Sequence, residues 1–368
     1  MSLSVLVIGG YGNFGTIVCR HLAAVEGIEL YAAGRDAARL ANLAQRFALQ
    51  TWCGDAHAAG FADTLRQLGI DLVIHTGGPF QGQSYRVAEQ CIEAGVHYCD
   101  LADCRTFVNG IHVLDAPARA AGVAVLSGCS SVPSLSAALL DEQRQRFARI
   151  DRIEHGISSS AKMPGLATVE GVLAYAGQPI LQRRGGQPHA VHGWLGLQRR
   201  QLPGLGWRWL ANVDVPDMDL FGERYGARDL VFKAGPGLMP GALATALLAQ
   251  ARRLGLIADP APWARRLHRM GTACERFGDG RSALYLEVHG VDHNQLPLRL
   301  DIQLNAAREK GQEIPACASV ALARKLADSY QPTPGARPCV GEISVAEYLA
   351  AIDAPADLQL HVRYQGGA

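Results

Sequence analysis

The sequence predicts the α/β fold class in two parts: a doubly wound parallel sheet, and a second α+β domain with a mixed or antiparallel sheet. Three observations predict it. Short apolar runs alternate with helical segments over roughly the first 130 residues, which is the pattern of βαβ units. The first apolar run ends in a glycine-rich segment, VLVIGGYGNFG at residues 5–15. In the later half of the chain, apolar residues recur at every second position, as in antiparallel strands with one buried face.

The first part is predicted to contain parallel strands separated by helices. The strands are expected at Leu3–Ile8, 28–33, Leu49–Cys53, Asp71–His75, His97–Asp100 and Val123–Leu126. The helices are expected at about 13–24, 36–47, 58–68, 83–94 and 105–121. Asp36 has the short acceptor side chain of an N-cap and stands where the second helix begins.

The second part has a different periodicity. Leu284, Leu286 and Val288 alternate with polar residues, and after the polar turn Asp292–Gln295 the alternation resumes over Leu296–Asn305. This pattern predicts an antiparallel hairpin with one apolar face. Further strands and loops are expected at 180–215, helices at 240–254 and 314–329, and a last strand at 358–364.

Composition limits the classes of partner. Lys plus Arg total 35 and Asp plus Glu total 34, a balance that offers no basic field for a nucleic-acid backbone. No apolar stretch reaches the roughly 18 residues of a membrane span, and the N-terminus has no signal-peptide pattern. The nine cysteines include no CxxC pair, so we expect reduced thiols and no metal site. We therefore expect a cytoplasmic protein with a small-molecule substrate and neither a nucleic-acid nor a membrane partner.

The glycines after the first strand carry the most specific motif. Gly10, Gly12 and Gly15 form G-x-G-x-x-G between a predicted strand and a predicted helix, the context in which this pattern indicates a Rossmann dinucleotide site. The first glycine is expected to permit the tight turn, the second to admit the diphosphate, and the third to let helix and strand pack closely. The unpaired N–H groups at the helix start would then hold the phosphates. The predicted cofactor contacts in this segment are Gly10, Tyr11, Gly12, Asn13, Phe14 and Gly15.

The end of the second strand distinguishes NADP from NAD. An acidic side chain there usually binds the ribose 2′-hydroxyl of NAD, whereas this chain has Gly34 and Arg35. A glycine leaves room and an arginine can pair with a 2′-phosphate, so NADP is expected and NAD is the less favoured cofactor. The alternative is a solvated Arg35, with Asp36 binding the ribose. Asp55, after the third strand, is a candidate to lie near the adenine, with an ordinary turn aspartate as its alternative.

The length of 368 residues exceeds what one core usually supports. Residues 1–135 are predicted to form the dinucleotide-binding domain and residues 136–312 a substrate and dimerisation domain. Residues 313–368 are predicted as a C-terminal segment whose helix packs back on the first domain and which ends in a last strand. A homodimer is expected because a wide sheet with one apolar face often pairs with a second copy.

Segments at the ends of four predicted strands resemble a known family. The glycine motif, A-G-R at the second strand, G-P-F after the fourth and CIEAGVHYCDLAD at the fifth are similar to the saccharopine dehydrogenase (reductase) superfamily, over roughly the first 140 residues. Later segments, GLATVEGVLAYAGQP and VDVPD, resemble bacterial members. The resemblance implies an oxidoreductase acting on an amino-acid-derived imine, with the loops at Gly77–Phe80 and Asp100–Asp103 lining the cleft. It does not imply saccharopine as the substrate.

The candidate functional side chains follow the carboxyl ends of strands, where open α/β sheets bind ligands. Cofactor contacts are expected at Thr76, Gly77, Gly78 and Pro79, and from backbone amides of the 127–136 loop. Asp100, Asp103 and Tyr98 are the catalytic candidates, to stabilise an iminium or relay a proton, with His97 behind them. Their alternatives are a core position for Tyr98 and a helix N-cap for Asp103. Four arginines are candidates to clamp a substrate carboxylate, with ordinary exposed positions as the alternative: Arg183, Arg184, Arg199 and Arg200.

The predicted reaction is hydride transfer between NADPH and an imine or carbonyl carbon, in either direction. Two alternatives stay open. A Rossmann domain can serve a nucleotide sensor or assembly protein without turnover, because fold does not imply function. Enoyl reduction of a lipid-like substrate is the other.

Overall fold

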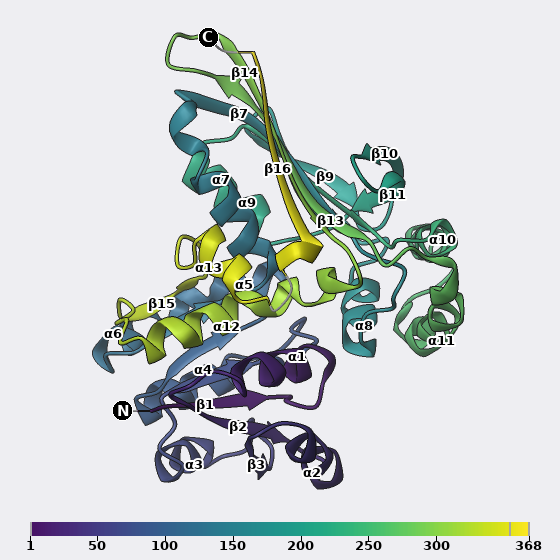
Figure 1. The fold of residues 1–368 in the computed structure, drawn as a ribbon. Coiled ribbons are helices and arrows are strands. Elements are labelled where there is room, and N and C mark those ends of the chain that lie inside the picture. Colours follow the sequence, from purple (N-terminus) through teal and green to yellow (C-terminus); the bar gives the residue numbers. More distant parts are fainter. Residues whose placement is uncertain (1, 353–354, 367–368) are drawn as a thin grey trace. The chain divides into compact units, whose positions relative to one another are not determined.

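The computed structural model describes residues 2–352 and 355–366 (Figure 1). Within these residues the chain forms two compact units. The first contains residues 2–138 and 313–352, and the second contains residues 139–312 and 355–366. The C-terminal part therefore contributes to both units.

The first unit is built on a parallel sheet. Over the described residues it has seven strands, in the order β15-β6-β5-β4-β1-β2-β3. They are β1 (Leu3–Ile8), β2 (Ile28–Gly34), β3 (Gln50–Cys53), β4 (Leu72–His75), β5 (His97–Asp100), β6 (Ala124–Ser127) and β15 (Gly335–Pro338). The strand order reverses at β1, which pairs with both β2 and β4. This reversal is the topological switch point, and open α/β sheets bind ligands at the carboxyl ends of the strands there. The strand order confirms the predicted doubly wound sheet.

Helices connect these strands. They are α1 (Asn13–Leu22), α2 (Ala37–Arg46), α3 (Phe61–Gln67), α4 (Arg86–Ala94), α5 (Arg105–Gly110), α6 (Asp115–Ala120), α12 (Ile314–Ala327) and α13 (Val345–Ala350). The predicted N-cap of α2 is confirmed, since the Arg39 amide donates to Asp36 Oδ1 at 3.0 Å. α12 contacts α1 through Glu313, whose carboxylate lies 2.9 Å from His21 Nε2 and 2.6 Å from the Arg20 guanidinium.

The single helix predicted at 105–121 is wrong, because a short 3₁₀ helix, η1 (Ile111–Leu114), separates α5 from α6. The Tyr85 hydroxyl donates to the Phe107 carbonyl at 2.7 Å, and the Ile111 amide turns to the Val108 carbonyl. A side chain from another element thus takes the carbonyl that would have continued the helix.

The second unit contains a mixed sheet. For the described residues its order is β10-β11-β12-β7-β13-β14-β16, with β8 attached to β12 and β9 to β8. The strands are β7 (Arg149–Ser158), β8 (Pro179–Arg184), β9 (Gln187–His192), β10 (Gln198–Leu202), β11 (Gly206–Asn212), β12 (Asp229–Gly235), β13 (Ser282–Val291), β14 (Pro297–Ala306) and β16 (Leu358–Gly366). The predicted hairpin is confirmed as β13 and β14, and the last strand pairs with β14.

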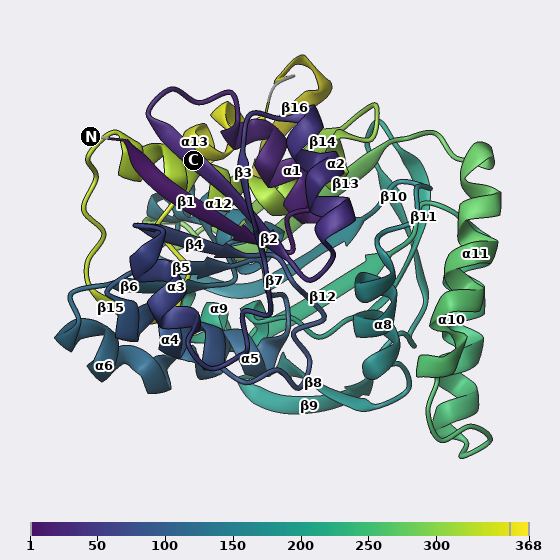
Figure 2. The same ribbon diagram turned by 90° about the horizontal axis from the view of Figure 1, so that it is seen from below.

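The two faces of this sheet differ in polarity. Ile153, Leu286 and Leu300 are buried on one face, whereas Glu154 and Glu287 occupy paired positions on the other. The helices of the unit are α8 (Leu166–Ala174), α9 (Asp217–Tyr225), α10 (Met239–Arg253) and α11 (Ala264–Cys274), and α7 (Ser136–Asp141) crosses the boundary between the units. Figures 1 and 2 show α10 and α11 together at one edge of the second unit. None of the helices in the described part of the chain has the length and hydropathy of a membrane span.

Candidate functional site

The turn between β1 and α1 is held by backbone hydrogen bonds. Gly9 has φ +74°, a left-handed conformation that favours glycine, and its carbonyl accepts from the Gly12 amide at 2.7 Å. The sequence assigned the tight turn to Gly10, and this assignment is wrong by one residue. A Cβ on Gly10 would lie 2.8 Å from the Ala32 Cβ, so Gly10 instead permits the turn to approach β2.

The next two glycines have different surroundings. A Cβ on Gly15 would lie 2.1 Å from the Gly9 carbonyl oxygen, so α1 packs directly on the turn. A Cβ on Gly12 would meet only the Gly9 oxygen, at 3.0 Å, and otherwise open space. No acidic side chain occupies the first turn of α1, and no side chain caps it. Among the described residues, no side chain lies within 4 Å of the Gly12 Cβ position or caps the start of α1, which fits the approach of a dinucleotide diphosphate to the N–H groups there.

The end of β2 is covered by Tyr11. A Cβ on Gly34 would lie 2.3 Å from Tyr11 Cε1, so the room expected beside Gly34 holds the Tyr11 ring. The Arg35 amide donates to the Tyr11 hydroxyl at 3.1 Å, and the Arg39 guanidinium lies 4.3 Å from the ring centroid. Neither the Arg35 guanidinium nor the Arg39 guanidinium has an acidic partner among the residues that the structure describes. Sequence reasoning missed Arg39, which one helical turn separates from Arg35.

Asp36 and Asp55 both have local hydrogen-bond partners. Asp36 caps α2, and Asp55 Oδ1 accepts from the His57 amide at 2.9 Å, as an ordinary turn aspartate does. Contact between Asp55 and the adenine stays a prediction.

The loop after β4 is supported by two polar side chains. The Thr76 hydroxyl donates to the Ile8 carbonyl at 2.8 Å, which fastens this loop to the end of β1. Gln83 Nε2 donates to the Gly77 and Pro79 carbonyls at 2.8 and 2.7 Å. Of the predicted contacts, Thr76 and Gly77 therefore border the glycine turn, and Gln83 holds the backbone of Gly77 and Pro79. Gln83 ends the sequence HTGGPFQGQ at residues 75–83, but nothing in its spacing indicated this role.

Asp100 is the most constrained acid of the first unit. It is fully buried, and its Oδ1 accepts from the Ala102 amide at 3.0 Å, the Ser127 hydroxyl at 3.0 Å and the Gly128 amide at 2.9 Å. Oδ2 is buried without a hydrogen-bond partner among the described residues. Burial raises the pKa of this carboxyl to about 6, although the three hydrogen bonds favour its charged form. Asp100 thus joins the ends of β5 and β6.

Tyr98 lies in the core beside His75. Its hydroxyl is 3.1 Å from His75 Nδ1, and both side chains are buried. Burial lowers the pKa of His75 to about 3, with a further contribution from His57, and raises that of Tyr98. His97 stands at the opposite, amino end of β5, where its Nδ1 accepts from the Ala124 amide at 3.0 Å. The structure therefore favours the core alternative for Tyr98, and its catalytic role stays a prediction without an exposed atom to carry it.

Asp103 differs from Asp100 in exposure. Its side chain is exposed, yet the surrounding protein desolvates the carboxylate enough to raise its pKa. The N-cap alternative is wrong, because Cys104 is the N-cap of α5 and no side chain caps that helix. Of the two candidate acids, Asp100 and Asp103, it is Asp103 that a ligand can reach.

The 127–136 loop was expected to offer backbone amides to a nicotinamide. The Gly128 amide instead donates to Asp100 Oδ1, the Cys129 amide to the Asp100 carbonyl, and the Ser130 amide to the Gly128 carbonyl. The loop is buried, and the Tyr348 hydroxyl donates to the Ser130 carbonyl. These three amides are consequently engaged by the chain itself, which contradicts the expectation for residues 128–130.

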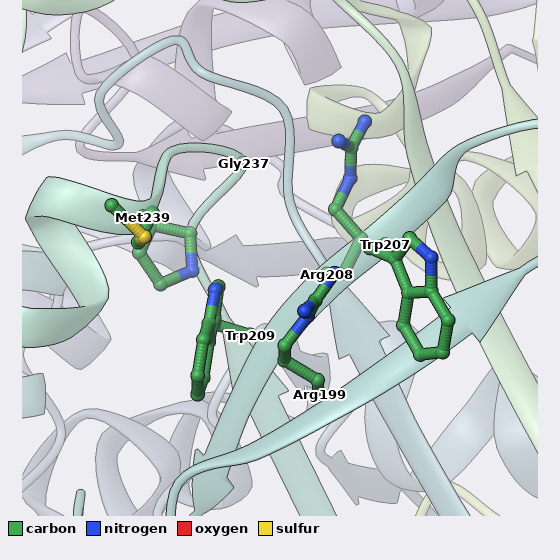
Figure 3. A pocket seen from close by; sticks show the side chains of 7 residues that line it. Arg199, Trp207, Arg208, Trp209, Gly237 and Met239 are labelled. Atoms are coloured by element: carbon green, nitrogen blue, oxygen red, sulfur yellow. The ribbon is translucent and has the colours of Figure 1, made fainter.

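The arginine candidates of the second unit separate into different environments. Arg200 is paired with Glu154 and Glu287, at 2.6 and 2.5 Å. Arg199 lies between Trp207 and Trp209 in a pocket of about 380 Å³ (Figure 3), with its guanidinium 4.6 Å from the first ring centroid. Arg183 and Arg184 line another pocket, of about 350 Å³. The four arginines therefore do not form one carboxylate clamp.

Comparisons with known proteins agree with this geometry. Residues 5–145 match the family described as saccharopine dehydrogenase NADP binding domain. The structure of saccharopine dehydrogenase (L-Glu forming) from Saccharomyces cerevisiae is similar, with a TM-score of 0.68 and 12% identity over 99% of this chain and 100% of that one. Homospermidine synthase from Legionella pneumophila, in complex with NAD, has a TM-score of 0.61 and 10% identity over 99% and 91% of the two chains. A search of curated protein sequences finds no match. At these identities the solved structures show a shared fold.

Proposed function

Because residues 5–145 match the saccharopine dehydrogenase NADP binding domain family, we propose that the protein is an NADP-dependent oxidoreductase. The proposed reaction is hydride transfer to or from an imine or carbonyl carbon of an amino-acid-derived small molecule. The observation that carries the proposal is the turn at Gly9–Gly15, where among the described residues no side chain lies within 4 Å of the Gly12 Cβ position and none caps the start of α1. The start of α1 and the loop at Thr76–Pro79 would hold the cofactor, which supplies the hydride when bound.

The chain's own contribution is to hold the substrate and move a proton. Reduction of an imine or a carbonyl leaves a nitrogen or an oxygen that must take up a proton. The exposed Asp103 carboxyl, with its raised pKa, is suited to supply it. Asp100 is a positioning residue in this proposal, since its hydrogen bonds fasten the strand ends from which the Asp103 loop departs.

We expect Asp103→Asn to lower kcat about a hundredfold while leaving the Kd for NADPH unchanged, because the amide cannot release a proton at the reacting atom. Stopped-flow measurement of NADPH oxidation, together with fluorescence titration of NADPH, separates the two quantities. Asp63→Asn is a matched control, since Asp63 is also exposed but lies on α3 and pairs with Arg66. An unchanged kcat for Asp103→Asn would remove Asp103 from the mechanism.

Cofactor preference is proposed to depend on Arg35 and Arg39. Arg35→Asp is expected to weaken NADPH binding by at least about tenfold and to leave NADH binding similar, because the 2′-phosphate loses a cationic partner and meets a carboxylate. Titration of both cofactors by calorimetry measures this preference. Arg46→Asp, at the far end of α2, is the control. Equal binding of NADPH to Arg35→Asp and the wild type would favour NAD as the natural cofactor.

Turnover distinguishes the oxidoreductase from its alternatives. Consumption of NADPH with pairs of keto acids and amines supports the proposal. Tight NADPH binding without oxidation of any such pair would favour a nucleotide sensor or assembly protein, and consumption with enoyl thioesters would favour an enoyl reductase. A homodimer remains part of the proposal, and sedimentation velocity measures it.

A further inference from the structure

The second unit exposes an unusual number of large apolar side chains in one segment. Of the fourteen large apolar side chains exposed among the described residues, eight lie within residues 239–277, about a tenth of the chain. They are Met239, Leu243, Leu247, Leu254, Leu256, Trp263, Met270 and Phe277. We call them, with the arginines among them, the 239–277 surface. Exposed apolar residues scattered singly are ordinary, but such a concentration indicates a surface that contacts something.

The exposed residues of α10 share one face. Met239, Leu243 and Leu247 follow each other at intervals of four residues, which places them in one row along the helix. The helix packs on its unit through small residues on another face, where Ala242 and Ala249 are buried. A Cβ on Gly177 would lie 2.2 Å from the Ala249 carbonyl oxygen, so the backbone approaches closely there. The apolar row of α10 is therefore left outside the core.

The charge of this segment is strongly positive. Residues 239–277 hold six arginines and two acidic residues, while the rest of the chain holds 29 Lys plus Arg against 32 Asp plus Glu. Arg252 donates to the Ala174 carbonyl at 2.9 Å and is thereby used within the fold. The others have no ion pair within residues 2–352 and 355–366: Arg253, Arg265, Arg266, Arg269 and Arg276.

Two of these arginines stack on exposed rings. The Arg266 guanidinium lies 5.3 Å from the Trp263 ring centroid, and that of Arg276 lies 4.9 Å from the Phe277 centroid. A cation over the face of an indole or phenyl ring is a favourable pairing. Each pair offers an apolar ring and a cation at the same place, which is the chemistry that an interface between lipid and water requires.

We propose that the 239–277 surface docks onto an anionic lipid surface. The apolar row of α10, with Trp263 and Phe277, enters the boundary between headgroups and acyl chains, and the unpaired arginines contact lipid phosphates. The pocket around Arg199 adjoins this surface, because Met239 lines it, and adds one more guanidinium without an acidic partner in the described chain (Figure 3).

Charge argues against the other occupants. In a symmetric contact between two copies, the same surface would be used on both sides, so two net-positive surfaces would meet with few acids to compensate the arginines. An acidic protein would pair with the arginines, but it would cover the apolar row of α10 less completely than lipid does. The chain's overall balance gave no reason to expect a membrane partner, since the positive segment is offset by acids elsewhere. Surface docking requires no spanning helix.

The test is flotation of the intact chain with vesicles, without cofactor. Vesicles of phosphatidylglycerol mixed with phosphatidylcholine are compared with vesicles of phosphatidylcholine alone, at low and high salt. We expect binding to the anionic vesicles that falls with salt. Leu243→Ser/Leu247→Ser is expected to lower the partition coefficient at least about tenfold, and Arg265→Gln/Arg269→Gln about twenty-fivefold.

Matched controls use residues of the same kind elsewhere. Val113→Ser removes an exposed apolar side chain of the first unit, and Arg144→Gln removes an exposed arginine outside the segment; neither is expected to change the partition. Circular dichroism and thermal melting establish that every variant folds. Binding no stronger to anionic than to neutral vesicles would overturn the proposal, and so would self-association that Leu243→Ser/Leu247→Ser abolishes. The measurement is independent of the proposed oxidoreductase activity.

Discussion

Replacement of Gly12 by valine is expected to lower NADPH affinity about a thousandfold while the protein still folds. The backbone of Gly12, with φ −74° and ψ 177°, is an extended conformation that valine adopts readily. Its Cβ would lie 3.0 Å from the Gly9 carbonyl oxygen and would have no side chain of the described residues within 4 Å. The same side chain would occupy the surface that the diphosphate needs, because that approach requires bare backbone. Fluorescence titration of NADPH and thermal melting give the two readings.

Two further glycine variants make this result interpretable. Gly15→Ala is expected to disrupt the turn itself, since its Cβ would lie 2.1 Å from a backbone oxygen, so it should lose stability as well as binding. Gly241→Ala, on α10 of the second unit, would place its Cβ 3.3 Å from the Pro236 ring and is expected to leave NADPH binding unchanged. Wild-type affinity in a folded Gly12→Val would mean that the diphosphate lies elsewhere, and the redox assignment would lose its support.

Replacement of Asp100 by alanine is expected to lower the free energy of unfolding by about 3 kcal/mol at neutral pH. The alanine leaves two buried amides and the Ser127 hydroxyl without their acceptor, and each such loss costs about 1–3 kcal/mol. Relief of the buried charge offsets part of that cost. Urea unfolding followed by circular dichroism measures the difference. A loss below about 1 kcal/mol would show that this carboxylate does not fasten β5 to β6.

The pH dependence of stability gives an independent reading of Asp100. Its pKa is about 6 in the folded chain and about 3.9 in an unfolded one, so the native state binds more protons between these values. The contribution of Asp100 to stability therefore falls as pH rises from about 4 to about 6 and is constant above that range. Asp100→Asn keeps the acceptor oxygen and removes the titration, so it is expected to lose this dependence. The deficit of Asp100→Ala should be larger at pH 5 than at pH 7 for the same reason.

The catalytic candidates show where inference from a linear chain is limited. Asp100 and Asp103 lie three residues apart in one motif, and their spacing gave no reason to separate them. The fold buries Asp100 under the loop after β6 and leaves Asp103 exposed. Burial depends on elements that are distant in the sequence, such as Ser127 and Gly128, so only the folded chain could distinguish a positioning carboxylate from an accessible one.

Periodicity predicted the elements whose neighbours are local. The strands of the parallel sheet, the Asp36 cap and the hairpin of β13 and β14 each depend on a pattern within some twenty residues. The sequence shows such a pattern because side chains point to the same face at a fixed interval in helices and in strands. β15 was not predicted, because its four residues carry no such pattern and it becomes a strand by pairing with β6. The break between α5 and α6 was missed for a similar reason, since Tyr85 comes from α4's N-cap position.

The sequence by itself determined the fold class, the first six strands in their order along the chain, and the position of the glycine turn between the first strand and the first helix, because adjacent residues suffice to encode them. The tertiary structure alone decided which acid is accessible, that Tyr11 fills the space beside Gly34, and that the arginines and leucines of residues 239–277 share one exposed segment. The physical reason is that exposure and pairing are set by what packs against a residue. Those neighbours come from any part of the chain.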